Sequence, residues 1–196
     1  MPNVIGATVF LWAFGEATIF PLPPEVLLIP LVTVLPRSWG LLCSIALLGS
    51  LAGGVWSFLA AKWESKKSLS QLRNRIGVVP GMVTKAEHWI SKYQTKAVLF
   101  SAWTGIPYKI FANLSGATNQ HFGRFLMTSI LARGSRLLVI GWITQILVIR
   151  WHDAIWAQRL WLLFFYVLFV GLGYEWNQRV YKKRITTKGR FPYGIV

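Results

Sequence analysis

Residues 16–30 read EATIFPLPPEVLLIP, and this stretch decides the predicted fold. It places two carboxylates, Glu16 and Glu25, in an apolar segment that prolines interrupt. Between Met1 and Pro36 the chain has no lysine, arginine or aspartate, so these glutamates carry its only side-chain charges there. A soluble loop would surround such carboxylates with other polar groups. The stretch therefore indicates a helix that breaks inside a membrane.

The composition is that of a membrane protein. Of the 196 residues, 54% are hydrophobic and 15% aromatic, and the mean hydropathy is +0.47. The net charge of +15 comes from basic blocks that alternate with long apolar runs, a pattern that is typical of membrane proteins and disfavours nucleic-acid binding. The single cysteine, Cys43, excludes an intrachain disulfide, and the histidines have no metal-ligand spacing. We therefore expect no metal and no cofactor.

The apolar runs are of two kinds. Uninterrupted runs of about 20 residues are long enough to cross the hydrocarbon core. Runs with internal prolines leave backbone carbonyls that cannot face lipid without a partner. We predict that the broken runs are re-entrant helix-break-helix hairpins; a pair of kinked spanning helices is the alternative. The predicted breaks lie at Pro21, Pro23 and Pro24 in the first hairpin and at Gly105 and Pro107 in the second.

These runs predict an all-α integral membrane protein with two opposed re-entrant hairpins and about three spanning helices. In the loop between the halves, Val83, Ala86, Ile90 and Tyr93 recur at the spacing of an amphipathic helix. Residues 1–148 form the predicted membrane domain. The predicted order is a hairpin at 4–36, a spanning helix at 39–61, a basic amphipathic loop at 62–96, a hairpin at 97–116, a spanning helix at 122–148, a C-terminal spanning helix within 149–176 and a basic tail at 177–196.

Charge predicts the orientation. If each hairpin enters and leaves on one face, the basic loop and the basic tail share a face, which is then expected to be cytoplasmic. An offset of 83 residues places Pro24 on Pro107 and Trp39 on Phe122. This weak repeat indicates two inverted halves of the kind found in transporters, with chance similarity as the alternative. The predicted location is a bacterial inner membrane, with several crossings.

Arg133 and Arg136 lie three residues apart in a predicted spanning helix, and so on one helix face. Each arginine at the centre of a bilayer costs about 2.5–3.5 kcal/mol on insertion scales, so the two need partners. Glu16 and Glu25 are the obvious carboxylates, and Lys109 follows the second break. We predict that these five residues meet between the two halves.

Two interpretations of this charged cluster stay open. It is either a buried ion-pair network that fixes the packing of the halves, or a site at which Arg133, Arg136 and Lys109 receive an anionic group such as a lipid phosphate, which the arginine fork suits. In the second case Glu16 and Glu25 would exchange protons as the anion comes and goes. For the small residues Gly49, Ser50, Gly53 and Gly54, close helix packing is favoured over a permeation path.

These residues resemble the DedA family of bacterial inner-membrane proteins, also called the VTT or SNARE-associated family, and most of all its YqaA-like branch. Phe14, Glu16, Pro21, Pro23 and Glu25 fit the family pattern F-x-E-x4-P-x-P-x-E, and GIPYKIFANLSGA followed by FLMTSILARGSR looks like its second hairpin and arginine-bearing helix. The resemblance covers about residues 5–148. It implies two opposed hairpins and movement of lipids such as undecaprenyl phosphate or phospholipids between leaflets, in several members with dependence on the proton gradient.

The resemblance also implies roles for individual residues. The family's functional acids fall on Glu16 and Glu25, and its helix arginines on Arg133 and Arg136. Two departures stand out: Pro24 occupies a position where many members have glycine, and Lys109 replaces an arginine that is common after the second proline. The helix at 39–61 also lacks an acid that some members carry there.

The predicted function is therefore transport of an anionic lipid between leaflets, with proton coupling and homo-oligomerisation left open. The alternative is a membrane scaffold that binds anionic lipids or a partner protein through its basic loop and tail. An enzyme is not expected, because no nucleophile-base pair or metal-ligand spacing is visible, although two carboxylates alone do not exclude one acting on a lipid headgroup.

Overall fold

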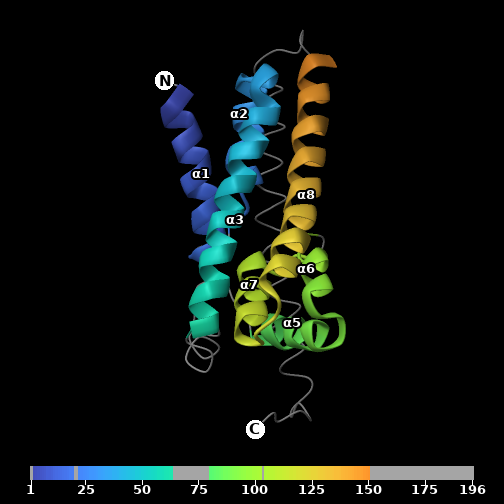
Figure 1. Cartoon of the computed structure of the whole chain (residues 1–196). Helices are drawn as coiled ribbons and strands as arrows, with labels where there is room; N and C mark the ends of the chain where they lie inside the picture. Colours follow the sequence, from blue (N-terminus) through green and yellow to red (C-terminus); the bar gives the residue numbers. More distant parts are fainter. Residues whose placement is uncertain (1, 20–21, 64–79, 103, 151–196) are drawn as a thin grey trace.

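The computed structural model describes residues 2–19, 22–63, 80–102 and 104–150, and in these ranges the regular elements are all helices. The predicted C-terminal helix within 149–176, apart from its first two residues, and the tail at 177–196 lie outside the described residues. Figure 1 shows the arrangement. In chain order the elements are α1 (Pro2–Thr18), α2 (Glu25–Val34), the 3-10 helix η1 (Pro36–Ser38), α3 (Trp39–Trp63), α5 (Pro80–Tyr93), the 3-10 helix η2 (Gln94–Lys96), α6 (Ala97–Phe100), α7 (Tyr108–Ala117) and α8 (Phe122–Arg150).

Two of these helical segments, Pro36–Trp63 and Phe122–Arg150, are long and apolar enough to cross a membrane. They include the predicted spanning helices at 39–61 and 122–148 and extend both by a few residues. At a rise of about 1.5 Å per residue, α8 is about 43 Å long, which exceeds a hydrocarbon core of about 30 Å. This part of the predicted fold class, an all-helical chain with long apolar helices, is confirmed.

Each predicted break separates a pair of helices, and the two pairs lie at opposite ends of the molecule. In Figure 1, α1 begins and α2 ends at the end where η1 leads into α3, whereas α6 and α7 lie at the opposite end beside α5. Pro24 precedes α2 with helical backbone angles (φ −64°, ψ −19°). A proline suits this position because the amide groups that start a helix have no partner within the helix.

The second break contains a backbone conformation that only glycine adopts without strain. Gly105 has φ 67°, in the left-handed region, and Pro107 then precedes α7 in an extended conformation. At its other end α7 finishes at Ala117, and Asn119, two residues further on, has φ 57°. The amides of Asn119 and Gln120 return to the carbonyls of Gly116 and Ser115, the hydrogen-bond pattern of a Schellman motif. The chain then turns directly into α8.

Helix α3 is the centre of the bundle and packs against α1, α7 and α8. Its glycines permit this packing. A Cβ atom on Gly49 would lie 2.3 Å from the Phe10 carbonyl oxygen of α1, and one on Gly53 would lie 2.6 Å from the Phe14 carbonyl oxygen. Because these obstacles are backbone atoms, a side chain at either position would push the helices apart. This geometry supports the predicted close packing of the small residues.

We expect Gly49→Ala to lower the free energy of unfolding by about 1–3 kcal/mol, because the added methyl group overpacks the contact between α1 and α3. Gly40→Ala is the matched control, since Gly40 lies in the same helix and a Cβ atom there meets nothing within 4 Å. It should be neutral or stabilise by up to about 1 kcal/mol. Thermal unfolding of the purified protein in detergent measures both. Equal effects would mean that the close approach of α1 to α3 is not a packing constraint.

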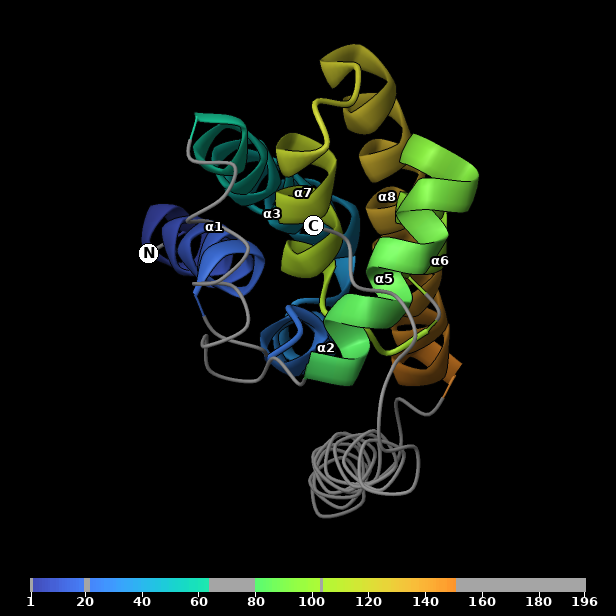
Figure 2. The ribbon, with the colours of Figure 1, turned by 90° about the horizontal axis from the view of Figure 1, so that it is seen from below.

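Helix α5 lies crosswise at the end of the bundle that carries α6 and α7, as Figures 1 and 2 show. Of the predicted apolar stripe, Val83, Ala86 and Ile90 are buried in the core, whereas Tyr93 is 39% exposed. Tyr93 instead packs edge-on against Phe100 of α6, with 5.7 Å between the ring centroids. The opposite face of α5 carries exposed Lys85, His88 and Lys92.

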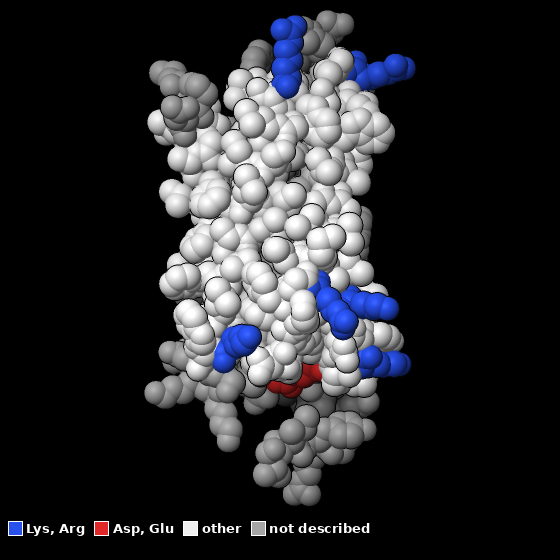
Figure 3. Space-filling model, viewed as in Figure 1, with Lys and Arg blue, Asp and Glu red and all other residues white. Residues whose placement is uncertain are grey.

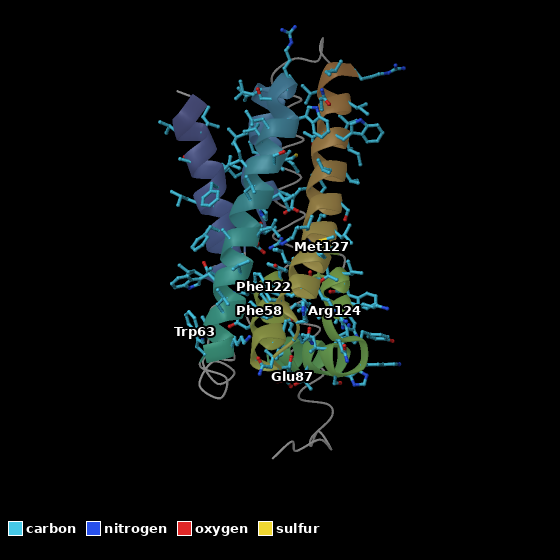
Figure 4. All side chains as sticks on the ribbon, viewed as in Figure 1. Phe58, Trp63, Glu87, Phe122, Arg124 and Met127 are labelled. Carbon is cyan, nitrogen blue, oxygen red and sulfur yellow. The ribbon has the colours of Figure 1, made fainter. Side chains whose placement is uncertain are left out.

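The exposed charged side chains on the visible face gather toward the two ends of the molecule. On the face in Figure 3, Lys and Arg lie toward both ends, and a broad band between them is uncharged. Arg37 in η1 and Arg150 at the end of α8 belong to one end. In Figure 4, Arg124 and Glu87 lie near the opposite end, and Trp63 points outward from the end of α3. The described basic residues at that end are Lys62, Lys85, Lys92, Lys96 and Arg124.

Candidate functional site

The structure brings charged residues from four helices together in the interior. Glu16 lies near the end of α1, Glu25 begins α2, Lys109 lies in the first turn of α7, and Arg133 and Arg136 lie on α8. Arg136 is the middle residue of α8, about 21 Å along the helix from either end. All five predicted site residues except Arg136 are at least nine-tenths buried.

Glu16 and Arg133 form a fully buried ion pair. Arg133 Nη2 donates a hydrogen bond to Glu16 Oε2, and only 5% of the Arg133 side chain and 7% of the Glu16 side chain are exposed. The guanidinium also stacks on the ring of Tyr108, with Cζ 4.4 Å from the ring centroid. The pair joins the first apolar segment of the chain to the last described one, a separation of 117 residues.

Glu25 and Arg136 form a second pair with a different environment. Arg136 Nε lies 2.8 Å from Glu25 Oε1, and Glu25 is fully buried, but 28% of the Arg136 side chain remains exposed. Within the described part of the chain, neither carboxylate oxygen of Glu25 accepts a hydrogen bond of good geometry. The guanidinium makes its hydrogen bond elsewhere, from Nη1 to the carbonyl oxygen of Ala102 at 2.9 Å. The carboxylate is therefore held by charge more than by hydrogen bonding.

Lys109 is fully buried and contacts the first break. Its ammonium donates a hydrogen bond of 2.9 Å to the carbonyl oxygen of Ile19, one residue beyond the end of α1. A cation at this position is favoured by the negative end of the helix dipole. The predicted contact of Lys109 with a substrate phosphate stays a prediction.

Each break thus receives a cation from a distant part of the chain. Lys109 contacts the Ile19 carbonyl before the first break, and Arg136 contacts the Ala102 carbonyl before the second. Carbonyl groups at an interrupted helix have lost their intrahelical donors, and they need substitutes wherever water is scarce. The two cations are therefore part of the architecture as well as candidate ligand contacts.

Several contacts of this cluster were not predicted from the sequence. Tyr108 stacks on Arg133 and donates a 2.8 Å hydrogen bond to Ser129 Oγ, and Ala102 accepts from Arg136. Tyr108 directly precedes Lys109 and Ser129 lies one turn before Arg133, so proximity in sequence was the one available signal. Of the predicted break residues, Pro23, Pro24, Gly105 and Pro107 flank the breaks, and Pro21 lies outside the described residues.

Comparison with known proteins gives relatives without an assigned activity. The chain is 28% identical over 133 residues to an uncharacterized protein of Haemophilus influenzae, a match that covers 66% of each chain. It is also 28% identical over 128 residues to an uncharacterized homologue from Histophilus somni, covering 65% of this chain and 66% of the relative. No family model and no solved structure matches.

The described part of the chain contains no group of three His, Cys, Asp or Glu placed to hold a metal ion. What it offers instead are carboxylates and guanidinium groups in a largely desolvated setting. Such groups can bind an anion, exchange a proton or simply hold the helices together.

We expect Arg133→Gln to destabilise the protein by about 3–5 kcal/mol, because it leaves the Glu16 carboxylate buried without its partner. The double variant Glu16→Gln/Arg133→Gln should lose less than the sum of the two single changes, with a coupling energy of about 0.5–3 kcal/mol. Thermal unfolding of the wild type, the two single variants and the double variant in detergent measures this coupling energy. Arg124→Gln, an exposed change on the same helix, is the control and should stay within about 0.5 kcal/mol of the wild type. Additive single effects would show that the two side chains do not pair.

Proposed function

We propose that the protein is a multi-pass membrane protein that moves an anionic lipid between leaflets, with Arg136 as the contact for the lipid phosphate and Glu25 as the proton-exchanging group. In this proposal α1 with α2 and α6 with α7 are two re-entrant hairpins that enter from opposite faces. The arrangement of both pairs at opposite ends of the molecule supports this topology. The resemblance to the DedA family supports the same reading.

One observation carries the proposal. Arg136 lies at the middle of a helix long enough to cross a membrane, it pairs with a fully buried carboxylate, and 28% of its side chain is still exposed. A charge kept at such depth is costly, and intramembrane charges usually mark a substrate or ion pathway. A purely structural buried pair needs full hydrogen bonding to offset its desolvation cost, and the Glu25 carboxylate lacks it.

The chemistry of the pair fits a phosphate. Arginine presents parallel N–H groups that bind phosphate and carboxylate oxygens alike, so a lipid phosphate can replace Glu25 on the Arg136 guanidinium. The released carboxylate would then be buried beside the new anion. Taking up a proton removes that repulsion, and the proton leaves when Glu25 regains Arg136. Binding of the anion and uptake of a proton would thus be coupled.

The N-termini of two helices also favour an anion at this site. Glu25 lies in the first turn of α2, and α7 begins at Tyr108. Both helices therefore begin at a break, where the positive ends of their dipoles favour negative charge.

The outer surface supports a lipid environment. Large apolar side chains stay exposed along α3 and α8, which a protein in water would rarely allow over so wide an area. Away from the terminal residues of these two helices, the most exposed are Leu41 at 64%, Leu48 at 60%, Trp56 at 65%, Met127 at 59%, Leu131 at 58% and Trp142 at 55%.

For the transport reaction, we expect Glu25→Gln and Arg136→Ala to abolish lipid movement in proteoliposomes. Glu25→Gln should leave the protein folded, whereas Arg136→Ala leaves the Glu25 carboxylate buried without its partner and should also destabilise the protein. The assay should offer fluorescent lipids with a phosphomonoester, a phosphodiester and an uncharged headgroup, with and without a proton gradient. Arg150→Ala, an exposed change at the end of the same helix, is the control and should transport normally. Normal transport by both site variants would refute the site.

If the wild type moves no lipid, and removal of residues 177–196 abolishes binding to anionic vesicles, the scaffold function holds instead.

The topology has its own test. In a Cys43→Ala background, a cysteine in place of Arg37 should react with an impermeant maleimide added to intact spheroplasts, because Arg37 is exposed at the less basic end. A cysteine in place of Lys92, exposed on α5 at the more basic end, should react only after permeabilisation. The reverse pattern would invert the orientation, and labelling of both from outside would contradict a spanning arrangement.

A further inference from the structure

The two arginines of α8 have unequal surroundings. The Arg133 side chain is 5% exposed and is held on two sides, by the Glu16 carboxylate and by the Tyr108 ring. The Arg136 side chain is 28% exposed and no described aromatic ring stacks on it. Any motion that frees Arg133 must therefore break a desolvated ion pair and a cation–π contact together, whereas Arg136 needs to release only its ion pair and one carbonyl.

Tyr108 is itself held by two contacts besides the one with Arg133. Its hydroxyl donates a 2.8 Å hydrogen bond to Ser129 Oγ, one turn before Arg133 on α8. Its ring stacks on Phe125, with 6.4 Å between centroids and 13° between planes, and Phe125 in turn stacks on Phe58 of α3 at 4.7 Å. Tyr108 is 3% exposed and Ser129 is fully buried. The tyrosine is thus a rigid platform under the guanidinium.

Gly54 supplies the space for this platform. A Cβ atom on Gly54 would lie 2.3 Å from the Tyr108 hydroxyl oxygen and 2.7 Å from its Cε1. Because the ring is confined between Phe125 and Arg133, it has little freedom to move aside. α3 therefore needs a glycine here for the tyrosine to reach Ser129.

We propose that Tyr108 is a positioning residue that locks Arg133 onto Glu16, so that of the two buried pairs only Glu25–Arg136 exchanges. The locked pair keeps α1 on α8 while the other pair opens. This inference rests on the proposed function for its purpose, since a transporter must hold its halves together while its ligand site changes partners. The lock itself is a property of the structure and can be tested without transport.

The test compares the chemical reactivity of the two arginines. Purified protein in detergent is treated with phenylglyoxal, a small membrane-permeant reagent for arginine, and the modification of each residue is followed by peptide mass spectrometry. In the wild type we expect Arg136 to react and Arg133 to stay protected. Tyr108→Leu removes the ring and should raise the rate at Arg133 about tenfold or more, the order expected for loss of a desolvated cation–π contact. The rate at Arg136 should change little.

Two further variants separate the lock from general loosening. Phe111→Leu is the matched control, because Phe111 lies one turn further along α7, is equally buried and packs on Trp89 instead of Arg133. It should leave Arg133 protected. Tyr108→Phe keeps the ring but loses the bond to Ser129, so it should expose Arg133 less than Tyr108→Leu does, and it remains informative if the leucine variant fails to fold.

Three outcomes would overturn the lock: equal reactivity of Arg133 and Arg136 in the wild type, unchanged protection of Arg133 in Tyr108→Leu, or equal exposure of Arg133 in Phe111→Leu. Absence of lipid movement in the wild type, together with the expected labelling, would refute the proposed function and leave the lock standing. Lipid movement without selective protection of Arg133 would refute the lock and leave the proposed function standing.

Discussion

A buried charge needs a partner of opposite sign, and this constraint organises the whole molecule. Two arginines in the middle of a long apolar helix are costly unless carboxylates meet them, and Glu16 and Glu25 lie in the first apolar segment, more than 100 residues away. The N-terminal segment has the opposite deficit, because its glutamates have no basic residue near them in sequence. Neither part of the chain is electrostatically complete, so their association is what makes both acceptable in an apolar setting.

The same cations also complete the backbone. Interrupted helices present carbonyls without donors, and here Lys109 and Arg136 supply donors to Ile19 and Ala102. In the proposed relation to the DedA family, these contacts bear on two departures from the family pattern. The Lys109 ammonium donates to the Ile19 carbonyl, a contact that needs no bidentate fork. Pro24 can stand in place of glycine because its position before α2 has φ −64°, where glycine's freedom is not required.

Close packing sets how accurately these groups meet. Gly49 and Gly53 allow α3 to touch the backbone of α1, and Gly54 admits the Tyr108 hydroxyl. Because the positions of α1, α7 and α8 are all set by contact with α3, small residues on α3 hold the charged side chains in register. The stack of Phe58, Phe125 and Tyr108 extends this order from α3 to the Arg133 guanidinium. The result is one closely held pair and one accessible pair within a single cluster.

The sequence by itself determined the helices, the breaks and the identity of the charged partners. Apolar length predicted α3 and α8, prolines predicted where α1 and α2 separate, and the scarcity of other acids in the apolar runs left Glu16 and Glu25 as the partners of Arg133 and Arg136. It could not assign Lys109 to the Ile19 carbonyl, or Tyr93 to the exposed edge of α5. Only the tertiary structure decided which glutamate meets which arginine, and that Arg136 stays accessible while Arg133 is enclosed by Tyr108. The physical reason is that hydropathy and charge are properties of single segments, whereas pairing and enclosure depend on where four separate helices come to lie around α3.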